Sequence, residues 1–247
     1  MSHTFFFICT TARSGSNLVC DYLSNTRLIG TVAEYMNPDV VRNGWQGQSF
    51  PFRGNVSLTR YLDFLTTAQG KRGVPLAVKL LYEDLEYLGQ TAMLHEVLKA
   101  SKLLLLRRRS KVSQAISYYL AEKTGRWIHT DEGFADPEAV EYDFDRIDEI
   151  LNMLTRQESA WATFCDWLGV RYYDLCFEDF IAAPRKTLEA LCEYAAVPMI
   201  RNFPVETTLL EQKSSLGRAF KARYLDEKWA AASRLEEIEY RGIVFTR

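Results

Sequence analysis

The sequence predicts an α/β fold in three layers, with a central parallel sheet flanked by helices. Short apolar runs alternate along the chain with longer segments whose apolar residues recur with a 3.6-residue period. The chain has 247 residues, of which 47% are hydrophobic and 25% are charged. A chain of this size and composition buries a large core without disulfides or a bound metal. We therefore expect one domain spanning residues 1–247.

The strands are predicted from the apolar runs. Phe5–Cys9 is the first run, and a loop rich in small residues follows it. The remaining predicted strands are Val74–Tyr82, Lys102–Leu106 and Val170–Leu175. Lys79 interrupts the first of these three, and consecutive arginines end the second.

The helices are predicted from the periodic segments. Asp145–Leu168 is the clearest of them, and Gly169 is placed to end it. The stretch Asn37–Asn55 is polar and is expected to be irregular. The other predicted helices are one that begins near Leu18, then Leu58–Ala68, Thr91–Ala100, Ser110–Glu122, Pro184–Ala195 and Arg223–Glu237.

Charge and cysteine content exclude several classes of protein. The net charge of −2 argues against a protein that coats nucleic acid or an anionic membrane. The five cysteines include no C-x-x-C pair and are expected to be reduced, and the three histidines lack metal-ligand spacing. No apolar run is long enough to span a bilayer, and no basic residue precedes the short apolar start. We therefore expect a cytoplasmic protein without a metal.

The loop Thr11–Asn17 is the first segment that suggests chemistry. It follows a predicted strand and precedes a predicted helix, so its backbone N–H groups and the helix dipole can hold a phosphate. Gly15 permits close approach, and Arg13 supplies charge. An ordinary strand-to-helix turn with a serine N-cap is the alternative interpretation.

Missing motifs narrow the choice of anion. The sequence contains no G-x-x-x-x-G-K-[ST] motif. The strand Lys102–Leu106 ends in arginines instead of the aspartate that a magnesium site requires. A metal-dependent ATPase or kinase is therefore disfavoured.

Arg107, Arg108 and Arg109 form the second segment of interest. Ser113 and Ser117 lie four residues apart, on one face of the helix that is predicted next. Arginines together with serine hydroxyls suit a second phosphate, distinct from the first. A solvated basic turn is the alternative.

Together these two segments resemble the family of sulfotransferases that use 3′-phosphoadenosine 5′-phosphosulfate (PAPS). The closest resemblance is to bacterial carbohydrate sulfotransferases of the Stf0-like, trehalose 2-sulfotransferase type. The motifs that carry it are R-S-G-S at Arg13–Ser16, a downstream glutamate at Glu34, and V-S-Q-A-x-S at Val112–Ser117. Weaker matches occur at Lys79, Arg156–Trp161 and Phe177–Phe180.

The resemblance implies a P-loop-NTPase-like fold and a specific reaction. PAPS would give its sulfuryl group to a hydroxyl of a carbohydrate or glycolipid-type acceptor, without a metal, and leave adenosine 3′,5′-bisphosphate. Glu34 would act as the general base, with Arg13 and Lys79 stabilising the transition state. A homodimer is also implied. The residues implied to bind the 5′-phosphosulfate are Arg13, Ser14, Gly15, Ser16 and Asn17.

The arginine for the 3′-phosphate is left open between two neighbours. An ungapped match of the V-S-Q-A-x-S block selects Arg108, with Ser113 and Ser117, whereas the spacing in other sulfotransferases selects Arg109 with Ser117. We prefer Arg108. Lys213, in a polar stretch, is a further candidate to cover the nucleotide.

Two other classes of function compete with this one. A non-catalytic nucleotide- or anion-binding protein on the same fold would keep the arginines and tolerate loss of Glu34. An ATP-dependent kinase is opposed by the missing motifs. The acceptor itself is not determined, because the aromatic residues that could form a platform for it are equally suited to a core: Trp45, Phe50, Phe52, Trp127 and Tyr142.

Overall fold

A computed structural model describes most of the chain, and its residues cluster into two compact units. Unit 1 comprises residues 1–111 and 152–211, and unit 2 comprises residues 112–151 and 212–247. The described residues are 5–43, 57–70, 74–89, 91–127, 135–197, 203–209, 214–233, 237–240 and 243–246.

Unit 1 contains a four-stranded parallel sheet with the strand order β2-β1-β3-β4. The strands are β1 (Phe5–Thr10), β2 (Leu76–Leu81), β3 (Lys102–Arg107) and β4 (Tyr172–Cys176). All the predicted strands are confirmed, with ends shifted by one or two residues. Because β1 is central, its carboxyl end lies beside those of both β2 and β3.

The helices of unit 1 include two that the sequence analysis missed and one inside the stretch predicted to be irregular. The missed helices are short and start directly at strand ends, so they leave too few periodic residues to be recognised. They are α4 (Tyr82–Leu88) and α8 (Phe177–Ala182). The stretch predicted to be irregular contains α2 (Pro38–Asn43). The predicted helices correspond to α1 (Ser16–Asn25), α3 (Leu58–Ala68), α5 (Ala92–Lys99) and α9 (Pro184–Tyr194).

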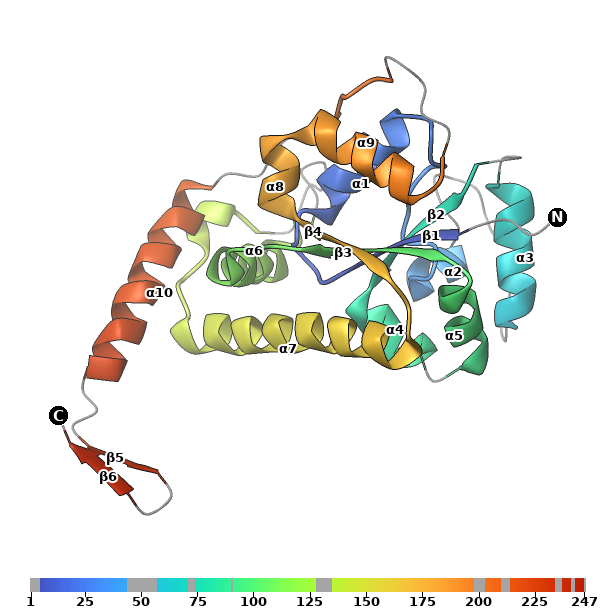
Figure 1. The fold of residues 1–247 in the computed structure, drawn as a ribbon. Coiled ribbons are helices and arrows are strands. Elements are labelled where there is room, and N and C mark those ends of the chain that lie inside the picture. Colours follow the sequence, from blue (N-terminus) through green and yellow to red (C-terminus); the bar gives the residue numbers. More distant parts are fainter. Residues whose placement is uncertain are drawn as a thin grey trace. The chain divides into compact units, whose positions relative to one another are not determined.

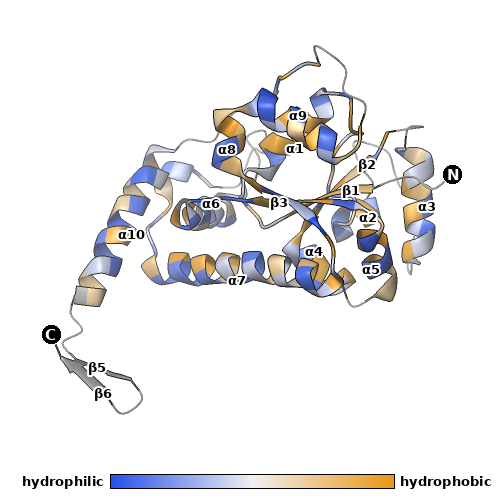
Figure 2. Ribbon diagram, in the orientation of Figure 1, coloured by the Kyte–Doolittle hydropathy of each residue, from blue (hydrophilic) through white to orange (hydrophobic). Residues whose placement is uncertain are grey.

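The sheet has a hydrophobic core on each face. Phe6 and Ile8 point to the face covered by α1, α8 and α9, whereas Phe7 and Cys9 point to the face covered by α3, α4 and α5. This alternation follows from the two-residue period of a strand. Figure 1 shows the helices on either side of the sheet, and in Figure 2 the hydrophobic colour runs along β1. The predicted three-layer architecture is therefore confirmed.

Unit 2 is mostly helical. Two long helices, α6 (Lys111–Thr124) and α7 (Phe144–Leu168), cross the boundary between the units, and Gly169 ends α7 with a φ of 66°. The unit also contains a short 3₁₀ helix (Pro137–Ala139), α10 (Ser215–Ser233) and the antiparallel pair β5 (Glu237–Tyr240) and β6 (Ile243–Thr246).

The prediction for the last helix was wrong at both ends. It begins at Ser215, eight residues before the predicted start, and Glu237 already belongs to β5. Phe220 and Tyr224, one turn apart on α10, are both buried, which explains the earlier start. Tyr224 also donates a hydrogen bond to Asp148 of α7.

Among the described residues, no helix has the length and hydropathy that a membrane span needs. All five cysteines are free, and four of them are buried. Burial raises the pKa of the Cys9 and Cys165 thiols. These cysteines therefore belong to the core.

Trp161 of α7 fixes the end of β1. Its ring is fully buried, and its Nε1–H donates a hydrogen bond of 2.9 Å to the backbone carbonyl of Thr10. That carbonyl belongs to the last residue before the loop that starts at Thr11. Trp161 therefore ties the start of the loop to the helical layer beneath the sheet.

Replacement of Trp161 tests this tie. Trp161→Phe keeps an aromatic ring but removes the donor, which leaves the Thr10 carbonyl without this hydrogen bond inside the core. We expect the free energy of unfolding to fall by about 2 kcal/mol. Trp167→Phe, at an exposed position of the same helix, is the matched control and should change it by less than about 0.5 kcal/mol. Urea denaturation measures both, and equal effects would contradict the tie.

Candidate functional site

The loop after β1 is shaped by two residues with left-handed backbone and by a hydroxyl pair. Arg13 has a φ of 59° and Gly15 a φ of 90°. The Thr10 hydroxyl donates to the Leu106 carbonyl at 2.8 Å, and the Ser14 hydroxyl lies 2.7 Å from the Thr10 oxygen. The loop is thereby fastened both to itself and to the end of β3. It curls directly before α1, and the N-terminus of a helix is a favourable place for an anion.

Gly15 is required at its position for a second reason. A Cβ atom at Gly15 would lie 2.3 Å from the ring of Phe177. The first residue of α8 therefore packs directly against the loop. The sequence analysis assigned Gly15 only to close approach of a ligand, and it gave Phe177 no role.

Lys79 and Glu34 form an ion pair beside the loop. The Lys79 ammonium is buried, and it donates to the Glu34 carboxylate at 2.5 Å and to the Asn17 side-chain oxygen at 2.6 Å. Glu34 is held in place because Ala33 accepts a hydrogen bond from the Lys79 backbone at the edge of β2. A buried ammonium needs such partners to offset its desolvation. Three predicted site residues therefore meet: a cation, a carboxylate and a loop amide.

The three arginines after β3 have different partners. Arg107 forms a two-pronged ion pair with Asp174, and Arg109 donates to Asp179 at 2.6 Å at the surface. Arg108 instead donates to the backbone carbonyl of Arg13 at 3.1 Å. Only Arg108 of the three is bonded to the loop in this way, so the two predicted anion-binding segments meet at this residue.

Lys111 fixes the backbone of the arginine turn, which is the segment Arg107–Ser110 that joins β3 to α6. Its ammonium donates to the Arg108 carbonyl at 2.6 Å and forms an ion pair with Glu158 of α7. Glu158 lies in the segment Arg156–Trp161 that the sequence analysis quoted without a role. The arginine turn is thus tied to the same stretch of helix as the end of β1.

These residues lie where the sheet topology favours a ligand. The strands β1 and β3 are neighbours, and the loop and the arginine turn follow directly at their carboxyl ends. In open parallel sheets, ligands bind outside the carboxyl ends of the strands. The loop and the arginine turn therefore lie at the edge of the sheet where a ligand is expected.

Two further carboxyl groups stand close to the ion pair. The pKa of Asp84 is raised to about 6, mainly by burial and to a smaller extent by the negative charge of Glu34. The neighbouring Glu83 also has a raised pKa, mainly through burial, and it shares a hydrogen bond with Gln157. The Asp84 carboxyl accepts a hydrogen bond from the backbone of Leu81. The site therefore combines one buried lysine with an excess of carboxylates, which the sequence analysis did not foresee.

Other predicted residues fall outside this cluster. Ser113 and Ser117 lie on α6 in unit 2 and are half-buried. Lys213 lies outside the described residues, as do Trp45, Phe50 and Phe52. Within the described part of the chain, no group of three or more His, Cys, Asp or Glu side chains is arranged to hold a metal ion.

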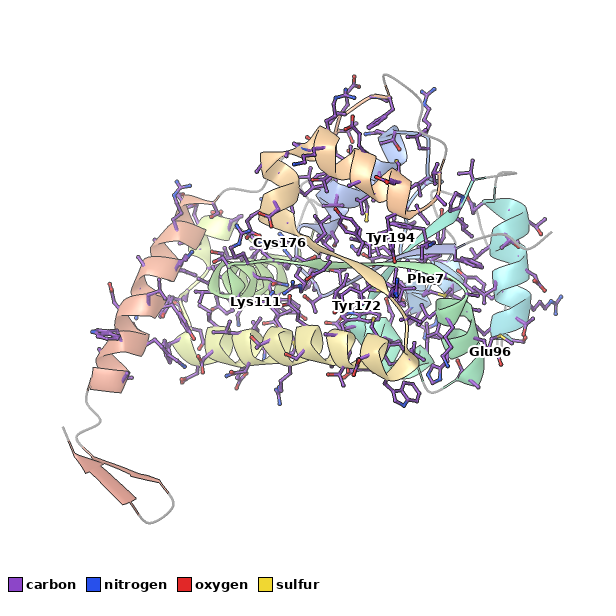
Figure 3. All side chains as sticks on the ribbon, viewed as in Figure 1. Phe7, Glu96, Lys111, Tyr172, Cys176 and Tyr194 are labelled. Carbon is purple, nitrogen blue, oxygen red and sulfur yellow. The ribbon has the colours of Figure 1, made fainter. Side chains whose placement is uncertain are left out.

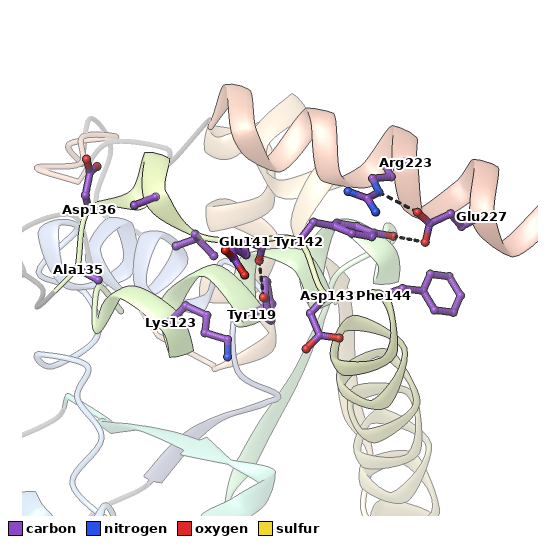
Figure 4. Close-up of a pocket in the computed structure, with 12 residues that line it drawn as sticks. Tyr119, Lys123, Ala135, Asp136, Glu141, Tyr142, Asp143, Phe144, Arg223 and Glu227 are labelled. Atoms are coloured by element: carbon purple, nitrogen blue, oxygen red, sulfur yellow. Dashed lines mark hydrogen bonds and ion pairs between the residues drawn. The ribbon is translucent and has the colours of Figure 1, made fainter.

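Tyr142, one of the aromatic candidates, lines a hollow of about 500 Å³ in unit 2 (Figure 4). Its hydroxyl donates to Glu227 at 3.3 Å, and the Arg223 guanidinium lies 4.0 Å from its ring centre. Tyr119 and Phe144 add aromatic lining. Trp127 packs edge-on against Tyr118 instead of lining this hollow.

Comparisons with known proteins agree with one another. A protein-family model described as Stf0 sulphotransferase matches residues 5–227. Among solved structures, the chain is similar to a sulfotransferase from Alicyclobacillus acidocaldarius, with 17% identity, a TM-score of 0.52, and coverage of 95% of this chain and 97% of that one. This likeness shows a shared fold and confirms the predicted P-loop-NTPase-like architecture.

Two more distant structures also match. One is the sulfotransferase domain from the curacin biosynthetic pathway, with 12% identity, a TM-score of 0.45, and coverage of 90% of this chain and 97% of that one. The other is retinol dehydratase in complex with retinol and PAP, with 12% identity, a TM-score of 0.46, and coverage of 97% and 84%. A search of curated protein sequences gave no match.

The raised pKa of Asp84 predicts a pH-dependent stability. Its ordinary pKa is 3.8, and in the folded protein it is about 6. The folded state therefore holds the proton more tightly, and the stability that this proton contributes is lost as the pH rises through 6. Asp84→Asn mimics the protonated form and keeps an oxygen for the Leu81 N–H. We expect the variant to be more stable than the wild type at pH 8, by up to about 3 kcal/mol, and equally stable at pH 4.

Urea denaturation at both pH values measures this difference. Glu86→Gln, which removes an exposed carboxylate of the same helix, is the control and should change stability by less than about 0.5 kcal/mol at either pH. A stabilisation by Asp84→Asn that is the same at pH 4 and pH 8 would contradict the assignment.

Proposed function

The chain belongs to the Stf0 sulphotransferase family, and from that premise we propose that it transfers a sulfuryl group from PAPS to a hydroxyl of a carbohydrate or glycolipid-type acceptor. The observation that carries the proposal is the meeting of Arg13, Arg108 and the Lys79–Glu34 pair at the carboxyl ends of β1, β2 and β3. This arrangement offers cations for an anionic donor and a carboxylate for an acceptor hydroxyl.

In the proposed reaction, the hydroxyl oxygen of the acceptor attacks the sulfur of PAPS, and Glu34 accepts the proton of that hydroxyl. A new oxygen–sulfur bond forms, and the bond between sulfur and the bridging oxygen of the 5′-phosphate breaks. The electron pair stays on the leaving adenosine 3′,5′-bisphosphate. Arg13, Lys79 and the first-turn N–H groups of α1 would stabilise the charge that develops there.

Residues on both sides of the loop would hold the donor. Ser14, Gly15, Ser16 and Asn17 are proposed to bind the 5′-phosphosulfate with Arg13. For the 3′-phosphate we propose Arg108, supported by its hydrogen bond to the loop backbone. Arg109 is the alternative, but its guanidinium is paired with Asp179 and 63% exposed. Ser113, Ser117 and Lys213 remain candidates for the same part of the nucleotide.

The carbohydrate or glycolipid-type acceptor is proposed from the resemblance to carbohydrate sulfotransferases. The hollow around Tyr142 in unit 2 is, taken by itself, suited to a sugar, since ring faces cover C–H surfaces and carboxylates accept hydrogen bonds from hydroxyls. The sequence-based expectations of a single domain, a cytoplasmic location and a homodimer stay predictions.

A non-catalytic binding protein is the competing proposal. Such a protein needs the cations of the loop and of the arginine turn to bind an anion. It does not need a carboxylate such as Glu34 that can accept a proton from a hydroxyl. The Lys79–Glu34 pair, in which the lysine is buried, therefore favours an enzyme, because a buried ion pair contributes little to stability by itself.

Donor binding tests the proposed function. Adenosine 3′,5′-bisphosphate should raise the melting temperature more than ATP with magnesium does. Arg108→Ala should weaken binding of adenosine 3′,5′-bisphosphate by about tenfold or more, because a charge-assisted contact to phosphate is lost. Binding of adenosine 5′-monophosphate should change little.

Arg109→Ala is the matched control, and calorimetry gives both affinities. If only Arg109→Ala abolishes recognition of the 3′-phosphate, the ungapped match is displaced by one residue. A larger stabilisation by ATP than by adenosine 3′,5′-bisphosphate would contradict the function itself.

Glu34→Gln separates an enzyme from a binding protein. The amide oxygen still accepts a hydrogen bond from Lys79, but it cannot take a proton at neutral pH. We expect turnover to fall by about 10²-fold or more, the contribution typical of a general base. Affinity for adenosine 3′,5′-bisphosphate should be kept or rise slightly, since a negative charge is removed near an anion.

Transfer of ³⁵S-sulfate to an accepted hydroxyl compound measures the turnover. Glu83→Gln removes the same charge from a neighbouring half-buried carboxylate and should keep most of the activity. Similar losses in both variants would mean that local charge matters and not proton transfer. Near-normal turnover of Glu34→Gln would remove Glu34 as the base.

A further inference from the structure

Phe177 and Glu178 stand between the two anion-binding turns, and the reaction proposed above leaves them without a role. They are the first residues of α8, which follows β4 directly after Cys176 (Figure 3). Phe177 is buried and Glu178 is half-buried. The two side chains lead to different partners.

Glu178 holds the backbone of the arginine turn. One carboxylate oxygen accepts a hydrogen bond of 2.9 Å from the N–H of Arg109, and the other accepts one of 3.4 Å from the N–H of Ser110. The Cys176 thiol donates to the first oxygen at 3.0 Å. Burial alone would raise the pKa of Glu178, but these hydrogen bonds lower it to about 2. The carboxylate is therefore charged at every physiological pH and binds the turn as an anion.

Phe177 makes contact with both turns. Its ring lies 5.9 Å from the guanidinium of Arg108, within the range of a cation–π interaction. The same ring occupies the space that a Cβ of Gly15 would need. The Phe177 ring therefore lies against both the loop after β1 and the guanidinium of Arg108.

The neighbouring Asp179 shows that this arrangement is specific. It lies in the same helical turn and carries the same charge, but it bonds to the exposed side chain of Arg109 and not to the backbone of the turn. Exposed ion pairs of this kind contribute little to stability. Only Glu178 of the two carboxylates can fix the path of the chain at Arg108.

We propose that Phe177 and Glu178 are positioning residues, which set the spacing between the loop at Arg13 and the turn at Arg108 and thereby fix recognition of the second phosphate of the donor. This inference rests on the proposed function, in which the loop binds the 5′-phosphosulfate and Arg108 the 3′-phosphate. Neither residue needs to touch the nucleotide for this effect. Both act through the place that they give to Arg108.

The test compares Glu178→Gln with Asp179→Asn, since each removes one negative charge from the first turn of α8. Calorimetry measures the affinities for adenosine 3′,5′-bisphosphate and for adenosine 5′-monophosphate, and their ratio reports recognition of the 3′-phosphate. Glu178→Gln should lower this ratio by about tenfold and leave the affinity for the monophosphate within about twofold of the wild type. Asp179→Asn should keep the wild-type ratio.

A double variant shows whether Glu178 acts through Arg108. In the Arg108→Ala background, Glu178→Gln should lower the ratio by less than about twofold, because the group that it positions is already gone. A further tenfold loss in that background would overturn the proposed route, and so would a wild-type ratio in a folded Glu178→Gln protein.

Circular dichroism checks that each variant is folded. If Glu178→Gln does not fold, Phe177→Leu takes its place, because leucine keeps the site apolar and removes the ring beneath Arg108. A wild-type ratio in Phe177→Leu would then overturn the proposal. Failure of the wild-type protein to discriminate the two nucleotides would instead overturn the proposed function, so the two failures are distinguishable.

Discussion

The site depends on the parallel pairing of β1 with β3. Cys9 pairs with Leu105 and Thr10 with Leu106, so both strands end at the same level. The hydrogen bond from the Thr10 hydroxyl to the Leu106 carbonyl stabilises this register. A slip of β3 by one residue relative to β1 would turn the side chains of β3 to the opposite faces of the sheet and move Arg108 away from the loop. The hydrogen bond from Arg108 to the carbonyl of Arg13 is a consequence of this register.

A buried lysine on the adjacent strand imposes the second constraint. Lys79 pairs in register with Ile8, so its side chain starts inside the core and must reach the strand end to find partners. Glu34 and Asn17 supply them. A charge buried in this way is rarely retained for stability alone, because its desolvation offsets most of the attraction between the charges. The pair ties the segment at Glu34 to the loop, and it joins the proposed base to the group proposed to stabilise the leaving phosphate.

Helices that begin directly at strand ends bring acidic side chains to the same edge of the sheet. The first turn of α4 reads Tyr-Glu-Asp and that of α8 reads Phe-Glu-Asp. Acidic residues there are favoured by the helix dipole. The two turns nevertheless differ in use. Asp84 is buried near Glu34 and holds a proton more tightly, whereas Glu178 is held as an anion by the backbone of the arginine turn.

The amino-acid sequence by itself determined the sheet, most of its helices and the position of the two segments that are proposed to bind the phosphates of the donor. Each of these has a local signature: the apolar run Phe5–Cys9, the period of α7, the glycine and serines of the loop, and the arginines that stop β3. Only the tertiary structure decided which arginine bonds to the loop, that Lys79 has Glu34 and Asn17 as partners, and that Phe177 fills the space beside Gly15. These contacts join residues far apart in the chain, and no local pattern records them, because strand register and helix packing alone bring such residues together.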